Sequence, residues 1–462
     1  MIDDPTLFLD CKRLFQGKAM LKAPLFLKQT HHAYLKARQL KGVYAFILKT
    51  IKNKWGHDHC LKNHKNKEKI KAELRQKKDA LIWSWIDDRC FANDKFQEIY
   101  LKNIYPILNQ EEKSWIIITH STLSKAQINK GYDHLKIIPL TYFLKWADIC
   151  RLMIQCFKYK ITLDKNNDCV KLCEFGLKKD VIYGRVEMLE GRLHRCLITR
   201  ALQQIKINKI IYPFENQPYE KMMILAKEQL NHPIQTIAYQ HASLPSLLLN
   251  YHVSHNEKAV MPQPDIIVAN GKKNQRILNE AGFTSKIING GSLRYNHSSS
   301  KIQVKKKSEN QKKVVLILLT YDSFQSIELL RALTQINDSN EIFLIKPHPH
   351  CSQEKIQKII TSLPENFIFT RKPITEIKHQ AKKVVHAGTT AAIECMDERV
   401  PIINFIPETI ALDSLTTIWP EQEAIDEKNI QKINEIGTFF SQELTYFEKV
   451  NEEQWKDLIS DK

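Results

Sequence analysis

The chain has 462 residues, of which 43% are hydrophobic and 26% are charged, and its formal net charge is +18. A chain of this length can bury more than one core, so we expect two or three domains. No apolar window of about 18 residues occurs, so we predict no membrane span, and the acidic start MIDDP does not suit a signal peptide. Ten cysteines without a CxxC pair favour a reduced, cytoplasmic chain over a disulfide framework.

The positive charge gathers in two clusters. Residues 62–78 carry eight lysines or arginines, and residues 301–313 carry six lysines. Such clusters attract nucleic acid, an anionic bilayer or a phosphorylated substrate, although a solvated surface is the simpler interpretation. No helix-turn-helix, RNP-like or zinc-finger pattern accompanies them, so we expect no nucleic-acid partner. Peripheral contact with the anionic inner-membrane surface stays open.

The predicted organisation begins with a basic, helical N-terminal extension. Its segment 57–64, HDHCLKNH, lacks the paired ligand spacing of a zinc module, so we expect no metal there. The polar, low-complexity stretch HSSSKIQVKKKSENQKK is the best linker in the chain. The predicted segments are an extension (1–79), an N-terminal acceptor domain (80–297), a linker (298–313), a C-terminal donor domain (314–420) and C-terminal helices (421–462).

Short apolar runs alternate with helical stretches through both predicted domains. The expected strands are 115–119, 209–212, 236–240, 265–269, 286–288, 314–320, 342–345, 367–370, 383–385 and 402–406. The expected helices are 140–159, 188–205, 220–230, 272–281, 324–336, 353–362, 374–380 and 390–398. This alternation implies βαβ units and parallel sheets. The predicted fold is therefore α/β, with two doubly wound, Rossmann-like domains facing a cleft.

The segment HAGTTAAIE follows a predicted strand and opens a predicted helix. His386 ends the strand, and Gly388 stands where the backbone would approach a ligand closely. Thr389 and Thr390 begin the helix, where free N–H groups and the helix dipole favour a phosphate. Glu394 lies one turn further and is placed to accept hydrogen bonds from ribose hydroxyls. The alternative is an ordinary helix start without a ligand.

The segment KPHP closes the strand predicted at 342–345. Proline cannot continue a strand ladder, so His348 between two prolines would be a rigid hydrogen-bond donor to a phosphate or an acid for the leaving group. Lys346 adds positive charge at the same strand end. A simple strand-end turn is the alternative, but the pairing with HAGTT about forty residues later favours a donor site.

Candidate catalytic residues follow two strands of the N-terminal domain. Glu215 in PFENQPYE or His241 in YQHAS could deprotonate an acceptor hydroxyl, or each could be a hydrogen-bonded turn residue. Candidate cleft and hinge residues are Asn270, Gly271, Arg294 and Tyr295.

Several motifs are missing from the chain. It has no GxxxxGK[ST] of P-loop NTPases, no GxGxxG of NAD or FAD enzymes and no GxSxG of α/β-hydrolases. No DxD motif occurs either, so we expect no catalytic metal and no cofactor. A helix N-terminus and basic side chains would have to stabilise a leaving phosphate.

Seven motifs together resemble a bacterial family of surface-carbohydrate biosynthesis proteins. In order they are FENQPYE, AYQHAS, MPQPDIIVANG, AGF, GGSLRY, KPHP and HAGTTAAIE. The arrangement is similar to GT-B glycosyltransferases with a His-Pro motif, including capsule sialyl- and Kdo-type transferases and, more distantly, CDP-glycerol glycerophosphotransferases. The likeness covers about residues 80–410 and not the N-terminal extension.

The resemblance implies roles for particular residues. His348, Thr389 and Thr390 would bind the nucleotide phosphate and Glu394 the ribose; the threonines stand where many relatives carry serines and keep the hydroxyls. The implied activity is metal-independent transfer of a sugar, favoured as a CMP-linked ulosonic acid ahead of UDP- or GDP-sugars, to a surface glycan or its lipid carrier. The alternatives are transfer of a CDP-linked polyol phosphate, or a catalytically inactive binding protein in glycan assembly.

Overall fold

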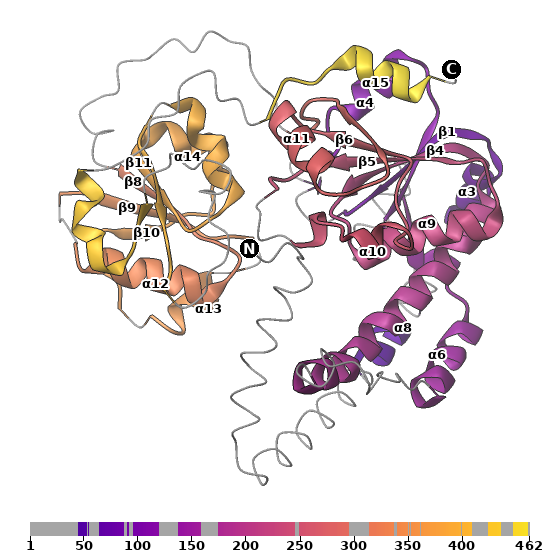
Figure 1. Ribbon diagram of the computed structural model, residues 1–462, viewed down its shortest axis with the longest axis horizontal. Helices are drawn as coiled ribbons and strands as arrows, with labels where there is room; N and C mark the ends of the chain where they lie inside the picture. Colours follow the sequence, from indigo (N-terminus) through magenta and orange to yellow (C-terminus); the bar gives the residue numbers. More distant parts are fainter. Residues whose placement is uncertain are drawn as a thin grey trace. The chain divides into compact units, whose positions relative to one another are not determined.

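The structure is a computed structural model in which two compact units can be described. Unit 1 draws on Met1–His241, Asn250–Asn296 and Glu448–Lys462, and unit 2 on Ala242–Leu249 and His297–Phe447 (Figure 1). The described residues are 45–52, 54, 64–86, 90–91, 96–119, 137–158, 174–244, 249–294, 314–336, 340–349, 351, 353–360, 362–398, 400–408, 424–435 and 447–460. Tyr295, the expected linker 298–313 and most of the expected extension lie outside these residues.

Unit 1 is built on a seven-stranded sheet in the order β3-β2-β1-β4-β5-β6-β7. Its strands are β1 (Lys78–Ser84), β2 (Trp115–Thr119), β3 (Ile137–Pro139), β4 (Ile207–Phe214), β5 (Gln235–Gln240), β6 (Ile266–Ala269) and β7 (Lys286–Asn289). Every neighbouring pair is parallel. The strand order is that of a Rossmann fold with one strand added, and it reverses between β1 and β4. Ligands of such sheets bind outside the carboxyl ends at this reversal.

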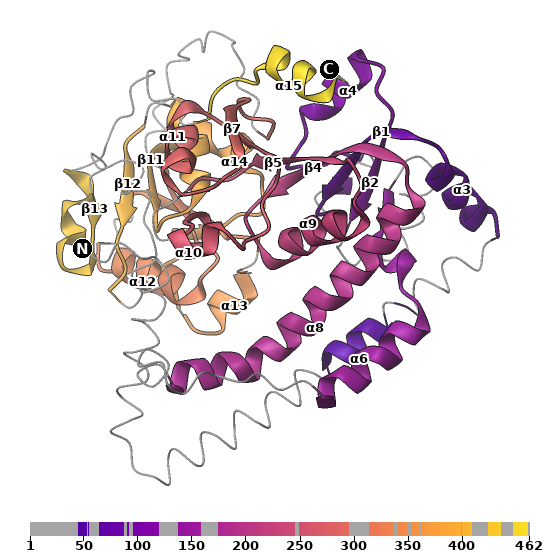
Figure 2. The ribbon, with the colours of Figure 1, turned by 45° about the vertical axis from the view of Figure 1, so that its right-hand side comes forward.

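Helices of 3 to 31 residues flank the sheet of unit 1 (Figure 2). The helices are α3 (His64–Arg75), α4 (Ile104–Gln110), η2 (Leu140–Phe143), α6 (Trp146–Lys158), α8 (Glu174–Gln204), α9 (Pro218–Leu230), η3 (Leu249–Tyr251), α10 (His255–Lys258), α11 (Lys272–Glu280) and α15 (Glu452–Ile459). The helix expected at 140–159 is broken, because Leu144 is extended and ends a 3₁₀ turn before α6 begins. The helix expected at 188–205 begins 14 residues earlier, at Glu174. Its first part was not predicted because polar residues interrupt the apolar pattern there.

Unit 2 is built on a six-stranded sheet in the order β10-β9-β8-β11-β12-β13. Its strands are β8 (Val314–Leu318), β9 (Ile342–Lys346), β10 (Phe367–Phe369), β11 (Ala381–His386), β12 (Ile402–Phe405) and β13 (Ala424–Ile425). All pairs are again parallel, and the order reverses between β8 and β11. Two doubly wound α/β units in succession confirm the predicted GT-B-like, Rossmann-like fold class.

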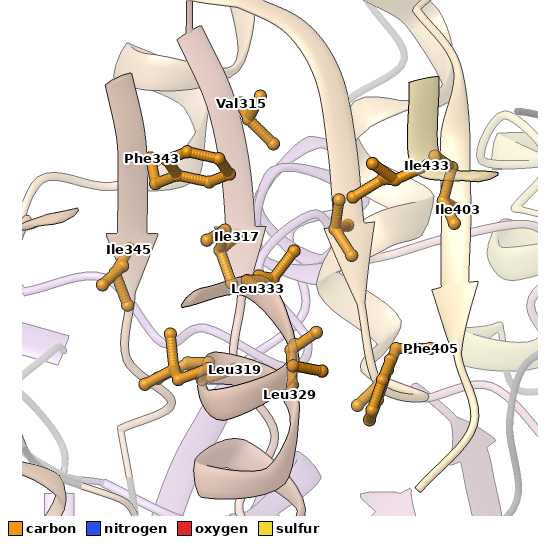
Figure 3. Close-up of a cluster of buried hydrophobic side chains, with 14 of the residues drawn as sticks. Val315, Ile317, Leu319, Leu329, Leu333, Phe343, Ile345, Ile403, Phe405 and Ile433 are labelled. Atoms are coloured by element: carbon orange, nitrogen blue, oxygen red, sulfur yellow. The ribbon is translucent and has the colours of Figure 1, made fainter. Parts of the chain in front are cut away.

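One face of the second sheet carries the core of unit 2. Alternate residues of neighbouring strands, among them Ile317, Ile403 and Phe405, pack against the helix α12 (Ser323–Thr334) (Figure 3). The inner strands β8 and β12 are buried on both faces almost throughout, which explains their apolar runs, whereas Ile342 of β9 and Ile368 of β10 are exposed. The remaining helices are α13 (Gln353–Gln357), α14 (Ile374–Ile377), η5 (Lys378–Gln380), η6 (Thr390–Glu398) and η8 (Glu427–Asn434).

Three of the helices expected in unit 2 differ from those observed. The helix expected at 353–362 ends at Gln357, and that expected at 374–380 is one α-turn followed by a 3₁₀ turn. The helix expected at 390–398 is a 3₁₀ helix over its whole length. The Ala392 N–H donates to the Thr389 carbonyl 3.1 Å away, the i to i+3 bond that tightens such a helix.

The segment expected as helical from 421 to 462 is instead divided between the two units. Its first described residues form β13 and η8 of unit 2, and residues 448–460 pack on unit 1. Trp455 is fully buried and its indole N–H donates to the Gly290 carbonyl at 3.0 Å. Gly291 has φ +68, and a Cβ there would lie 2.0 Å from the Lys449 carbonyl oxygen. The two glycines therefore accommodate the returning chain.

Candidate functional site

The candidate residues of unit 1 begin with the turn that follows β4, beside the reversal of strand order. Asn216 adopts a left-handed conformation with φ 52, which turns the chain sharply after Glu215. The carboxylate of Glu220, at the start of α9, accepts hydrogen bonds from the N–H groups of Glu215 at 2.9 Å and Asn216 at 3.0 Å. Burial raises the pKa of Glu220 to about 8, against the lowering effect of the Glu215 N–H. Glu220 therefore holds the turn that presents Glu215.

Glu215 and His241 lie side by side because β4 and β5 pair in register up to Phe214 and Gln240. The His241 Nε2 lies 3.4 Å from a Glu215 carboxylate oxygen, and the two side chains are 5% and 38% exposed. Burial, with a smaller effect from Arg294, lowers the pKa of His241 to about 3. Burial raises the pKa of Glu215, and Arg294 opposes this. The pair is thus a neutral imidazole behind a more exposed carboxyl group.

A loop after β1 adds residues that the sequence analysis missed. The Tyr100 ring packs edge-on against His241 with centroids 4.9 Å apart, and the Arg294 guanidinium carbon lies 5.5 Å from the Tyr100 ring centre. Glu98 is buried and accepts a hydrogen bond from the Ser84 hydroxyl at the end of β1 at 2.6 Å. Its other oxygen accepts from a backbone N–H of the same loop. The carboxyl ends of β1, β4 and β5 therefore contribute side chains to one polar cluster.

Asn270 and Gly271 follow β6 and make internal contacts. The Asn270 side-chain oxygen accepts a hydrogen bond from Asn274, and its N–H donates to the Gln240 side-chain oxygen at 3.3 Å. Its carbonyl accepts from the Glu448 N–H at 2.9 Å. Gly271 precedes α11 in an extended conformation. The structure gives both residues a role in holding the sheet edge, and a ligand role for them stays a prediction.

In unit 2 the HAGTT turn follows β11, directly beside β8, where the strand order reverses. Gly388 has φ +80, a conformation that favours glycine. Its N–H donates to the His386 Nδ1 at 3.0 Å. His386 is fully buried, and burial lowers its pKa to about 3, so the imidazole is neutral and acts as the acceptor that shapes the turn. The Thr389 hydroxyl lies 3.4 Å from the Ala391 N–H and is mostly buried.

The KPHP segment ends β9, the other neighbour of β8. The His348 ring centre lies 6.2 Å from that of Tyr321, which follows β8 and is 57% exposed. The Lys346 ammonium donates to the Arg371 carbonyl at 3.1 Å, and burial lowers the pKa of Lys346. Tyr321 was missed because the sequence analysis treated the end of this strand only as an apolar run. Strands β9, β8 and β11 are neighbours in the sheet. His348, Tyr321 and Gly388, which follow these strands, therefore lie at the same edge of the sheet.

Two further polar side chains lie behind this edge. Glu394 is half-buried on η6, and its backbone carbonyl accepts a hydrogen bond from the Lys378 ammonium at 2.9 Å. Asn404 on β12 stands opposite His386 in the sheet register. The Asn404 amide is fully buried, and neither its oxygen nor its nitrogen has a partner within the part of the chain that the structure describes. The sequence offered no signal for Asn404, because it stands inside an apolar strand.

Among the described residues, no group of three His, Cys, Asp or Glu side chains is arranged to hold a metal ion. The described helices also include none that is long and apolar enough to cross a bilayer.

Comparison with known proteins gives distant structural likenesses. No protein-family model matches the chain, and no curated protein matches its sequence. Methanocaldococcus jannaschii UDP-GlcNAc 2-epimerase, in complex with UDP-GlcNAc and UDP, has a TM-score of 0.47 at 11% identity, over 82% of this chain and 98% of that one. Acinetobacter baumannii MurG has a TM-score of 0.41 at 11% identity, over 82% and 99%. The glycosyltransferase SnogD from Streptomyces nogalater has a TM-score of 0.43 at 12% identity, over 78% and 90%. Likenesses at this level imply no shared substrate or reaction.

Proposed function

We propose that the chain is a metal-independent, GT-B-type glycosyltransferase that moves a sugar from a nucleotide donor to a bacterial surface polysaccharide or lipid-linked glycan. The observation that carries the proposal is the position of the HAGTT turn. It follows β11 beside β8, at the reversal of strand order in unit 2, where open α/β sheets bind their ligands. Glu215 occupies the equivalent position after β4 in unit 1.

In this proposal unit 2 holds the donor. Gly388 lets the backbone approach a phosphate closely, while His348 and Thr390 supply donors to its oxygens. Side-chain donors then stabilise the negative charge that develops on the leaving nucleotide, the work that a metal performs in other transferases. Because its imidazole is buried and already accepts the Gly388 N–H, His386 shapes this site from behind. Glu394 remains the proposed partner of the ribose.

Unit 1 would activate the acceptor. Glu215 takes a proton from an acceptor hydroxyl, whose oxygen bonds to the anomeric carbon while the bond from that carbon to the phosphate breaks. The electron pair of the broken bond leaves with the nucleotide. Glu215 is chosen over His241 as the base because its side chain is 38% exposed and that of His241 only 5%. His241 would position the carboxylate through its Nε2.

The donor is proposed as a CMP-linked ulosonic acid, on the resemblance carried by KPHP and HAGTTAAIE. The neighbouring Tyr321 and His348 rings suit a nucleotide of any base, so they do not choose among CMP, UDP, GDP and CDP. Transfer of a polyol phosphate from a CDP-linked donor would use the same phosphate contacts. It differs in which bond breaks, because phosphorus then travels to the acceptor.

A thermal-shift panel of CMP-, UDP-, GDP- and CDP-linked compounds tests donor binding. A ligand at about 100 times its Kd should stabilise the protein by about 2.7 kcal/mol, and we expect the largest shift from a CMP-linked compound. His348→Ala should abolish the shift, whereas His379→Ala, an exposed histidine of unit 2, should keep it. If no nucleotide raises the melting temperature, a binding protein without activity is favoured. A donor labelled in its phosphate separates the two activities. If that label, and not label in the sugar, is transferred to the acceptor, the protein is a phosphotransferase.

A further inference from the structure

Helix α6 is fixed to unit 1 through one face. Ile149 and Leu152 are 3% and 4% exposed and pack on the side of α8, which runs alongside α6 in both views (Figures 1 and 2). Asp148 is also buried, and one of its oxygens accepts a hydrogen bond from Arg200 of α8 at 2.7 Å. This two-pronged ion pair sets the rotation of α6 about its axis. The opposite face therefore points consistently to solvent.

The solvent face of α6 is apolar. Trp146, Met153 and Ile154 are 49%, 45% and 54% exposed, and Cys150 is exposed between them. Residues spaced by four, seven and eight positions share one face of an α-helix. Elsewhere in the described chain the exposed large hydrophobic side chains are scattered, and no other described helix carries three of them. A contiguous apolar face of this kind marks an interaction surface.

On α6 and the residue before it, the described charged side chains that reach solvent are cations. Arg151 and Lys145 are exposed beside the apolar face, whereas Asp148, the acid of the helix, is buried against Arg200. Described side chains of α6 thus present no carboxylate to solvent, in a chain whose net charge is +18. Tryptophan with flanking cations is typical of helices that lie at a membrane–water interface. In a two-fold contact between copies, the same cations would face each other, which disfavours a dimer.

We infer that α6 is a membrane-surface helix that binds anionic phospholipid bilayers. Its face of Trp146, Met153 and Ile154 enters the boundary between headgroups and acyl chains, and Arg151 and Lys145 contact the anionic headgroups. The helix has 13 residues, far fewer than a span requires, so it lies in the plane of the surface. This inference concerns where the protein binds and does not depend on the reaction it catalyses.

Vesicle flotation of the full chain tests the inference. We expect the protein to float with vesicles of phosphatidylcholine containing about one-third phosphatidylglycerol, and not with phosphatidylcholine alone. The double substitution Met153→Ser with Ile154→Ser should lower the partition coefficient at least about tenfold, because it removes two inserted side chains. The matched control is Val260→Ser with Ile359→Ser, whose side chains are 79% and 46% exposed outside α6 and which should float like the wild type.

A second readout locates the contact. Alkylation of Cys150, followed by mass spectrometry of its peptide, should slow with anionic vesicles and not with neutral ones. Arg151→Glu should weaken flotation, whereas Arg276→Glu on α11 should not. The inference is overturned if the α6 double variant floats like the wild type, or if the wild type does not float with anionic vesicles. It is also overturned if the wild type forms a dimer that the same double substitution dissociates, since the face would then bind a second copy.

Discussion

Acidification is expected to destabilise unit 2 through one buried imidazole, that of His386. Burial lowers the pKa of His386 from 6.5 to about 3, so the folded state excludes a proton that the unfolded chain binds. The perturbation that isolates this effect is His386→Asn. The asparagine oxygen can replace Nδ1 as the acceptor of the Gly388 N–H, but the amide does not titrate.

The sign and size follow from the two pKa values. The folded pKa lies below the unfolded one, so the stability contribution is complete above about pH 6.5 and is lost as the pH falls toward 3. Between pH 8 and pH 5 the loss for His386 comes to about 2 kcal/mol. The wild type should therefore lose about 2 kcal/mol more than His386→Asn over this interval. The variant itself should be less stable at every pH, because asparagine leaves a cavity.

The assay must report on unit 2 alone, because two units need not unfold together. Urea unfolding after equilibration at each pH, read by pulsed hydrogen exchange of the β11 peptide, meets this need. His379→Asn, at an exposed histidine of the same unit, controls for loss of an imidazole. Equal pH dependence in the wild type and His386→Asn would refute the reasoning, since it would mean that His386 titrates normally in the folded state.

Three further outcomes are expected. Gly388→Ala, at a φ of +80, should cost about 1–2 kcal/mol in urea unfolding and abolish the nucleotide-induced thermal shift; an unchanged shift would remove the turn from the donor site. Glu215→Gln should lower transfer at least about 100-fold while that thermal shift persists, and full activity would disqualify Glu215 as the base. Trp455→Ala should destabilise unit 1 by about 3–5 kcal/mol, because the indole is buried and donates to Gly290; a smaller loss in circular-dichroism unfolding would show that the returning segment contributes little.

The sequence was sufficient for the fold class because most strands contain a run of at least three apolar residues. WIIIT and the run at 314–318 are buried almost entirely, and such runs predict parallel strands. β1, one of the two strands at the reversal of strand order in unit 1, was missed because it opens with a lysine and an aspartate. Lys78 is nonetheless buried, and its ammonium lies 2.7 Å from a Glu73 carboxylate oxygen. An ion pair formed with the preceding helix cannot be recognised from composition.

The candidate site was predictable only where strand register determines proximity. Glu215 and His241 follow β4 and β5, and the pairing of these strands brings them to 3.4 Å. Tyr100 reaches the same side chains from a loop that no pattern in the sequence singles out, and Arg294, which was predicted as a cleft residue, contacts the Tyr100 ring from beyond β7. The 3₁₀ geometry of η6 was also unpredictable, because the segment TTAAIE suits either kind of helix. A phosphate at its start would therefore depend less on a helix dipole and more on side chains.

The return of residues 448–460 to unit 1 has a consequence for biosynthesis. Domains generally fold in the order in which the ribosome makes them, but unit 1 receives Trp455 only after all of unit 2 has been translated. Until then Gly290 lacks its indole partner and the side of the sheet that Trp455 covers stands open. The first unit to be synthesised is thus the last to be finished, so its final stability belongs to the whole chain and not to its N-terminal part.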